Sequence, residues 1–377
     1  MNSYVRIANK HLLTEVEKGD DKNLGASPLS FNAVLNMVAA GSTGRTLEQI
    51  LGFFGLTNVD QINSISSEMM AVASPSTDSS GGPVLSCLNA AWADQRFPLK
   101  PSYRDLLRHI YEGEAKNVDL ATQANQLMKE VNAWAEAASQ GHINNILRYS
   151  SAPLANALYF KGRWTRPFDP RRTTERDFYL LNGDKAKVAF MTNTEIHPYG
   201  SFEGFELLKI AYKSGEDCRQ FSMYILLPNE IDGLKSLLQR VDSDPGFLHQ
   251  RFDLRREFLA DFWVPKFKFS NSIEASSILR DLGLELPFMD NCKDLTEMVH
   301  NSHGLPFNIS NIIQKASIEV DETGTVAAAA TVGCICFGAV VGGGHSFVAD
   351  HPFMFTIKEE TSGLVFFTGA VLDPRSH

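Results

Sequence analysis

The chain has 377 residues, of which 44% are hydrophobic and 21% charged, so its composition excludes a largely disordered protein. The net charge of −9 at pH 7 gives no electrostatic footprint for nucleic acid or an anionic membrane, and neither partner is expected. Length alone is compatible with two or three domains.

The N-terminal quarter of the chain predicts helices. Apolar residues at helical spacing predict an amphipathic helix in the first twenty residues. The stretch 27–42 begins with the capping residues Ser27 and Ser30 and is apolar on nearly all sides, which predicts a helix buried in a large core. A short helix is predicted over 46–55 with Gly55 as its C-cap, and residues 73–83 have a loop composition.

Strand and helix signals alternate along the rest of the chain. Apolar runs rich in β-branched and aromatic residues predict strands over 84–94, 153–164, 221–229 and 258–270. Helical spacing predicts helices over 101–110, 122–139, 233–241 and 273–283. Because these elements lack a strict β–α–β rhythm and no linker divides them, we expect an α+β fold in one unit, residues 1–377.

The sequence carries no local signature of an active site. The motifs GxSxG, HExxH and GxxxxGK[ST] are absent, so we expect neither an enzyme nor a cofactor. His300 and His303, with Asp290 and Cys292 nearby, offer metal-ligating groups. Their polar turn favours solvated loop residues instead, and no metal is predicted.

The cysteines do not form a recognisable framework. Their odd number and irregular spacing argue against a disulfide scaffold or a zinc ribbon: Cys87, Cys218, Cys292, Cys334 and Cys336. The last two are too close along the chain for an unstrained disulfide, and incidental small side chains are favoured over a redox pair. The N-terminal residues lack the features of a secretory signal, so we expect a cytoplasmic protein, with non-classical release left open.

One segment stands apart from the rest of the sequence. Residues 324–349 contain no Asp, Glu, Lys or Arg, which is long enough for a transmembrane candidate. Six glycines interrupt the segment, and each costs about 1 kcal/mol inside a helix, so a transmembrane helix is not predicted. Read as a strand, both faces are small or apolar, which suits burial on both sides of a sheet. The alanines and glycines nevertheless make it a poor strand alone, so it is predicted to stay mobile until a sheet admits it.

Five segments, in order, resemble the signature segments of the serpins, most closely those of the plant group. They are GASPLSFNAVLNMVAAGSTGRTLEQIL, ANALYFKGRWTRPFD, DETGTVAAAAT, FVADHPFMFTI and LVFFTGAVLDP. The resemblance implies three β-sheets, eight or nine helices and an exposed reactive-centre loop at residues 322–346. It also implies suicide inhibition, in which the target protease forms a covalent acyl-enzyme and the cut loop then inserts as an extra strand.

The resemblance assigns roles within the loop. The hinge spans 322–331 and depends on small uncharged residues after a glutamate: Glu322, Gly324, Thr325, Ala327, Ala328, Ala329, Ala330 and Thr331. Val326 departs from the common glutamate at its position. The cleaved bond falls between Gly338 and Ala339, or between Phe337 and Gly338 if the register slips by one. Gly338 argues against a trypsin-like target, which leaves chymotrypsin-like, elastase-like and papain-like proteases.

The resemblance also implies a set of residues around the opening of the main sheet: Ser27, Ser30, Asn156, Trp164, Lys266 and Gln314. Lys266 is expected to pair with Glu322, and Gln314 replaces the histidine that most serpins carry. Gly25 and Ala26 replace bulkier residues. Together with Gly338 and a short distal loop, Gln314 leaves open a non-inhibitory serpin-fold binding protein. Otherwise a monomer that traps proteases is expected.

Overall fold

The computed structural model describes residues 2–376 except 20, 75–81, 120–121, 139–152, 218, 245, 291, 302–304, 306 and 326–343. The described residues form eight α-helices. These are α1 (Asn2–Glu17), α2 (Pro28–Ala40), α3 (Gly44–Phe54), α4 (Val59–Ala73), α5 (Pro101–Ile110), α6 (Ala124–Ala138), α7 (Leu234–Ser243) and α8 (Ser276–Asp281). Three short 3₁₀ turns are η1 (Pro170–Arg172), η2 (Phe247–His249) and η3 (Leu286–Phe288).

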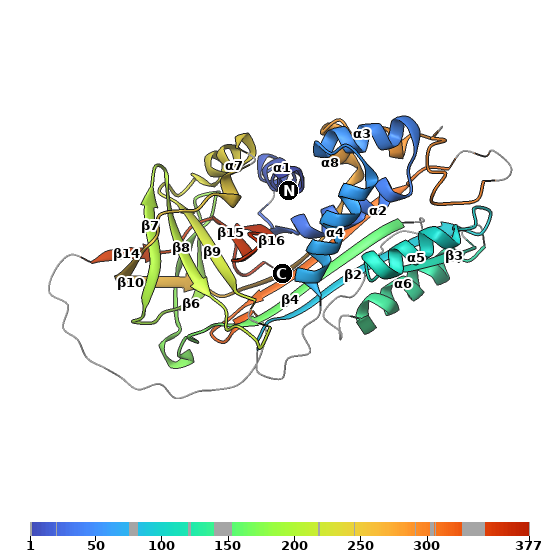
Figure 1. Cartoon of the computed structure of the whole chain (residues 1–377). Coiled ribbons are helices and arrows are strands. Elements are labelled where there is room, and N and C mark those ends of the chain that lie inside the picture. Colours follow the sequence, from blue (N-terminus) through green and yellow to red (C-terminus); the bar gives the residue numbers. More distant parts are fainter. Residues whose placement is uncertain are drawn as a thin grey trace.

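A six-stranded sheet runs through the middle of the molecule (Figure 1). Its order is β11 (Phe267–Glu274), β12 (Asn311–Val320), β13 (Gly324–Thr325), β4 (Pro153–Arg163), β2 (Val84–Asp94) and β3 (Glu114–Val118). β12 also pairs directly with β4, in parallel. The long strands β2 and β4 are mostly buried because helices cover them, and α6 contacts β2.

The second sheet has ten strands. Its order is β1 (Leu24–Ala26), β16 (Val365–Val371), β15 (Phe353–Glu359), β9 (Phe221–Pro228), β8 (Phe205–Ala211), β7 (Ile196–Phe202), β10 (Arg255–Pro265), β6 (Lys185–Met191) and β5 (Thr174–Tyr179), with β14 (His345–Val348) on β10. β10 pairs first with β7 and later with β6. It thus joins β6 and β5 to the strands from β1 to β7 in one continuous sheet.

The buried helix predicted near the N-terminus is α2, which contacts both β4 and β16. Ser27 caps it as predicted, since its side chain accepts a hydrogen bond from the Ser30 N–H at 3.1 Å. Ser30 lies inside the helix and is not a cap. Gly55 ends α3 in the left-handed conformation, as the sequence predicted.

Two predicted boundaries near residue 266 were wrong. The strand expected over 258–270 is two strands, because β10 ends at Pro265 in one sheet and β11 begins at Phe267 in another. Proline has no N–H to continue a ladder, and the Lys266 N–H bonds to Ala189. The helix expected over 273–283 begins only at Ser276, because residues up to Glu274 pair with β12.

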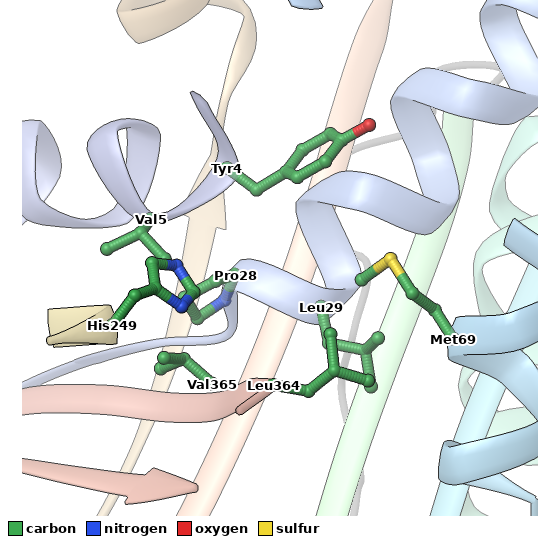
Figure 2. A pocket seen from close by; sticks show the side chains of 8 residues that line it. All are labelled: Tyr4, Val5, Pro28, Leu29, Met69, His249, Leu364 and Val365. Atoms are coloured by element: carbon green, nitrogen blue, oxygen red, sulfur yellow. The ribbon is translucent and has the colours of Figure 1, made fainter. Parts of the chain in front are cut away.

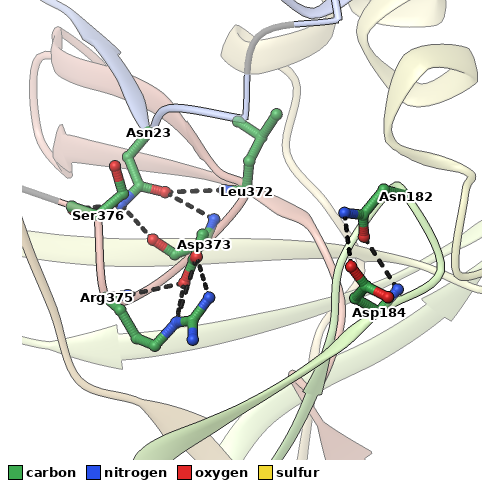
Figure 3. A network of polar contacts seen from close by, with 7 residues as sticks. All are labelled: Asn23, Asn182, Asp184, Leu372, Asp373, Arg375 and Ser376. Atoms are coloured by element: carbon green, nitrogen blue, oxygen red, sulfur yellow. Dashed lines mark hydrogen bonds and ion pairs between the residues drawn. The ribbon is translucent and has the colours of Figure 1, made fainter.

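Asn23 fastens the C-terminal segment to the start of β1 (Figure 3). Its amide NH₂ donates to the carbonyls of Asp373 and Ser376 at 2.7 and 2.9 Å. Its amide oxygen accepts from the N–H groups of Leu372 and Asp373 at 2.8 and 3.1 Å. All the hydrogen-bonding capacity of this buried side chain therefore goes to the C-terminus.

Within the described ranges, no helix has both the length and the apolarity needed to cross a membrane. Most of the uncharged segment, residues 326–343, lies outside those ranges.

Candidate functional site

The first residues of the uncharged segment are built into the six-stranded sheet. Thr325 of β13 pairs with Val320 of β12 on one side and with Gly162 of β4 on the other. Further along, β12 and β4 pair directly with each other, from Asn311 opposite Pro153 to Ser317 opposite Tyr159. β13 is therefore a short strand that lies between β12 and β4 at one end, whereas along the rest of their length β12 and β4 pair with each other. We call Asp321–Thr325 the loop anchor.

Only glycine fits at position 324 of the loop anchor. Its φ of 151° lies in a region that residues other than glycine rarely adopt. A Cβ atom there would also overlap the Gly162 carbonyl oxygen and lie 2.6 Å from the Arg163 Cα. Close backbone approach to β4 thus requires glycine.

Glu322 holds the anchor by its side chain and its backbone. One carboxylate oxygen lies 2.8 Å from the Lys266 Nζ, so the predicted pair is present. The other accepts a hydrogen bond from the Thr173 hydroxyl at 2.7 Å, and the backbone carbonyl accepts from the Phe168 N–H at 2.8 Å. Burial acts to raise the pKa of Glu322, but the hydrogen bonds from Lys266 and Thr173 outweigh it and keep the pKa below its ordinary value.

Trp164 and Tyr212 form the floor of the anchor. The buried indole of Trp164 donates to the Asp321 carbonyl at 2.9 Å, and its backbone N–H donates to the Thr323 carbonyl at 2.9 Å. The Tyr212 ring stacks on it with centroids 4.5 Å apart, and the Tyr212 hydroxyl lies 2.8 Å from the Thr325 Oγ1. Trp164 was predicted at this end of the sheet. Tyr212, Thr173 and Phe168 were not, because no sequence motif marks them.

A row of buried amides crosses the same sheet below the anchor. Asn89 of β2, Asn156 of β4 and Gln314 of β12 are in register on adjacent strands, and we call them the polar rung. The Asn156 amide donates to the Asn89 oxygen at 2.7 Å, and Asn89 donates to the Tyr111 carbonyl at 2.7 Å. This half of the rung is well connected.

The other half of the polar rung, around Gln314, is poorly connected by hydrogen bonds. Gln314 is completely buried, and neither its amide nitrogen nor its amide oxygen has a hydrogen-bond partner among the described residues. The same holds for the Asn156 oxygen and for the hydroxyl of Ser30 on α2. A buried unpaired polar group costs about 1–3 kcal/mol, so this part of the sheet is destabilised in the structure as it stands.

Gly25 and Ala26 are both enclosed by other parts of the protein. A Cβ on Gly25 would lie 2.8 Å from the ring of Phe269, so that ring fills the space of a larger side chain. Ala26 is fully buried opposite Thr368.

Several predicted residues lie outside the described ranges. They are Ala327–Ala330, Thr331, Cys334, Cys336, Phe337, Gly338 and Ala339 of the loop, together with Cys218 and His303. Of the suggested metal ligands, Asp290 accepts a hydrogen bond from Asn308, and Cys292 is buried. The part of the chain that the structure describes holds no group of three potential ligands able to bind a metal. Burial raises the pKa of the Cys87 thiol to about 11, which keeps it protonated.

A small cavity lies apart from the anchor (Figure 2). Its volume is about 10 Å³, room for roughly one water molecule, and it is lined by Tyr4, Val5, Pro28, Leu29, Met69, His249, Leu364 and Val365. The Nε2 atom of His249 has no hydrogen-bond partner in the described structure. This space is too small to hold a metabolite.

Comparison with known proteins agrees with this geometry. Residues 8–374 match the family model described as Serpin (serine protease inhibitor), and the chain belongs to the serpin family. Its relatives place it within the plant-type serpins. It is 41% identical to Serpin-ZX of Arabidopsis thaliana, covering 97% of this chain and 95% of the relative. It is 42% identical to Serpin-Z10 of the same plant, covering 100% and 97%.

The fold is likewise that of a solved plant serpin. The structure of Arabidopsis AtSerpin1 in its native stressed conformation superposes with a TM-score of 0.87, at 38% identity and 99% coverage of both chains. The α+β serpin fold predicted from the sequence is confirmed.

Proposed function

We propose that this member of a protease-inhibitor family acts by suicide inhibition, with residues 322–346 as the loop that the protease attacks. The observation that carries the proposal is β13, which places Gly324 and Thr325 between β12 and β4. A chain whose first residues are already paired there can continue down the sheet once its far end is released.

In the proposed reaction the protease's serine or cysteine attacks the carbonyl carbon of Gly338. The bond to Ala339 breaks, and the new amino group of Ala339 leaves with the proton that the protease supplies. Gly338 stays bound to the protease as an ester or thioester. The alternative cut between Phe337 and Gly338 follows the same chemistry and would suit a chymotrypsin-like enzyme.

The register of β13 predicts where an inserted loop would lie. Thr325 pairs with Val320 and Gly162, so an antiparallel extension of six residues brings Thr331 opposite both Gln314 and Asn156. Thr325 faces the core, where it contacts Tyr212, and an even step keeps Thr331 on that face. Its hydroxyl can donate to one amide of the polar rung and accept from the other.

This register supports insertion on energetic grounds. The groups that lack partners in the present structure, Gln314 and the Asn156 oxygen, are those that Thr331 would reach. The alanines that precede it suit a path between buried strands, because their side chains are small enough to pass the core and lose no rotamer entropy. Insertion would therefore relieve a cost that the uninserted sheet carries.

The experiment is incubation with a chymotrypsin-like and a papain-like protease, followed by denaturing electrophoresis. A stable band is expected near the protease mass plus 41.8 kDa, less the mass of the C-terminal peptide that cleavage releases. Mass spectrometry of the released C-terminal peptide identifies the cut bond. Clean cleavage with neither an adduct nor greater heat resistance would disprove suicide inhibition.

A second candidate is a non-inhibitory binding protein with a cleavable loop. The unpaired Gln314 favours it, since a destabilised polar rung could also impair the timing of insertion. The covalent adduct separates the two, because a loop that inserts too late leaves cleaved protein without a trapped protease. We propose a single-domain monomer, residues 1–377, in both cases; a cytoplasmic location stays a prediction.

A further inference from the structure

Positive charge is concentrated beside the loop anchor of this acidic protein. Residues 161–176 contain six Lys and Arg against two Asp and Glu, whereas the whole chain carries a net charge of −9. Arg163 lies at the end of β4, where its Cα is paired with Gly324. Arg172 directly precedes Thr173, whose hydroxyl bonds to Glu322. The charge thus accumulates where the loop leaves the sheet.

A second segment brings a further arginine to the same region. The ring of Phe168 stacks on Phe262 of β10 with centroids 5.9 Å apart, and Phe262 contacts His197 at 4.5 Å. Burial, and then the positive charges of Arg166 and of Arg256 on β10, lower the pKa of His197 to about 4. Both guanidinium groups therefore act on one histidine, although they are far apart in the sequence.

Most of these arginines are free to bind a ligand. Arg166 pairs with Glu195, but Arg163, Arg172 and Arg256 are exposed and form no ion pair with another described residue. A planar guanidinium binds a carboxylate through two parallel hydrogen bonds, so three free ones favour an acidic partner. We call Arg163, Arg166, Arg172 and Arg256 the arginine face.

The arginine face lies between the two attachments of the loop. β13 leads into the loop beside Arg163, and β14, which follows the loop, pairs with the strand that carries Arg256. A protease that holds the loop in its cleft is therefore brought over this surface. The net charge of −9 repels an acidic protease at long range, and the cations of the arginine face oppose that repulsion beside the loop.

We propose that the arginine face is a docking surface for the acidic face of the protease that attacks the loop. This inference rests on the proposed function, which identifies the partner as a protease. Complementary charge acts mainly on the association rate and on the choice of partner. The protein would accordingly prefer acidic proteases among those that accept its loop sequence.

The test compares two triple variants that each remove three positive charges. R163Q/R172Q/R256Q neutralises the free arginines of the face. R45Q/R108Q/K293Q neutralises three exposed cations elsewhere. Arg45 is on α3 and Arg108 is on α5 (Figure 1), and Lys293 precedes Asp294, which bonds to Thr46 of α3. Matching melting curves establish that both variants fold. The readout is the second-order rate of loop cleavage by two papain-like proteases, one acidic and one basic at the assay pH, as a function of salt.

For the acidic protease at low salt, the first variant is expected to be about 10-fold slower than wild type, with a weaker salt dependence. The control variant and the basic protease should show no such loss. Equal rates for the two variants, or an equal loss with both proteases, would overturn the proposal. The proposal would also be overturned if the first variant were cleaved by the acidic protease at the wild-type rate but no longer bound a heparin column. That result would indicate that the arginine face binds a polyanion instead. Because cleavage is measured whether or not an adduct forms, failure of the inhibitory function would appear separately, as missing adducts.

Discussion

The carboxylate of Glu322 lies 2.8 Å from the ammonium group of Lys266, fifty-six residues away in sequence, at the point where the loop leaves the sheet. The pair joins the anchor, between β12 and β13, to the residue between β10 and β11. The anchor is thereby tied to the position where the chain passes from one sheet to another, so any movement of the anchor strains this ion pair.

The first prediction concerns the pH dependence of this pair. Because the pKa of Glu322 is lowered from 4.5, its contribution to stability is complete above that value and is lost as the pH falls through the folded pKa. E322Q should unfold more easily than wild type at pH 7, by about 1 kcal/mol, since the pair is partly exposed. The difference should shrink as the pH falls below 4.5 and be lost once the Glu322 carboxylate is protonated in the folded protein. Urea denaturation at a series of pH values from 7 downward measures it. A gap that did not change with pH would mean that the carboxylate's charge is not what stabilises the anchor.

The second prediction concerns Gly324. G324A places a methyl group against the Gly162 carbonyl, so β13 should leave its position between β12 and β4. The expected result is more cleaved, untrapped protein per protease inhibited, together with a loss of about 1–3 kcal/mol in stability. G183A is the matched control, because Gly183 also has a positive φ, of 87°, but nothing lies within 4 Å of its Cβ position. Equal effects in the two variants would assign the change to backbone strain alone.

The sequence predicted the parts of the site that depend on local pattern. The capping of α2 by Ser27 and the left-handed end of α3 at Gly55 follow from residue type and spacing. The Glu322–Lys266 pair was expected only through the family resemblance. Nothing in the spacing of these two residues brings them together, since the contact depends on the order of strands in the sheets.

The remaining parts depend on tertiary packing. Tyr212 enters the anchor because the chain after β8 returns beside Trp164, a contact with no local signal. The break at Lys266 was missed because residue alternation continues across it while the chain changes sheets. That Gln314 replaces a histidine was visible in the sequence, but its lack of hydrogen-bond partners depends on how the strands and α2 pack around it.

The third prediction concerns the unpaired amide. Q314L replaces a buried group that has no partner with an apolar one of similar size, so the uninserted form should gain about 1–3 kcal/mol. The inserted form should lose the hydrogen bond proposed to Thr331, so trapping should become less efficient. Q239L on the exposed surface of α7 is the control and should change neither quantity. Denaturant unfolding and the stoichiometry of inhibition are the measurements. A destabilised Q314L protein would show that Gln314 is satisfied, for example by buried water.

The fourth prediction tests the register of insertion directly. If Thr331 reaches Gln314 and Asn156, then T331V should lower the heat resistance of the cleaved protein more than that of the intact protein, because its hydroxyl matters only after insertion. T331S keeps the hydroxyl and should behave like wild type. In the Q314L background T331V should cost less, since the two groups then no longer interact, and the difference is their coupling energy. Thermal unfolding of the cleaved proteins gives all four values. Strictly additive effects would place a residue other than Thr331 at the polar rung, and would shift the inserted strand by at least one pair of residues.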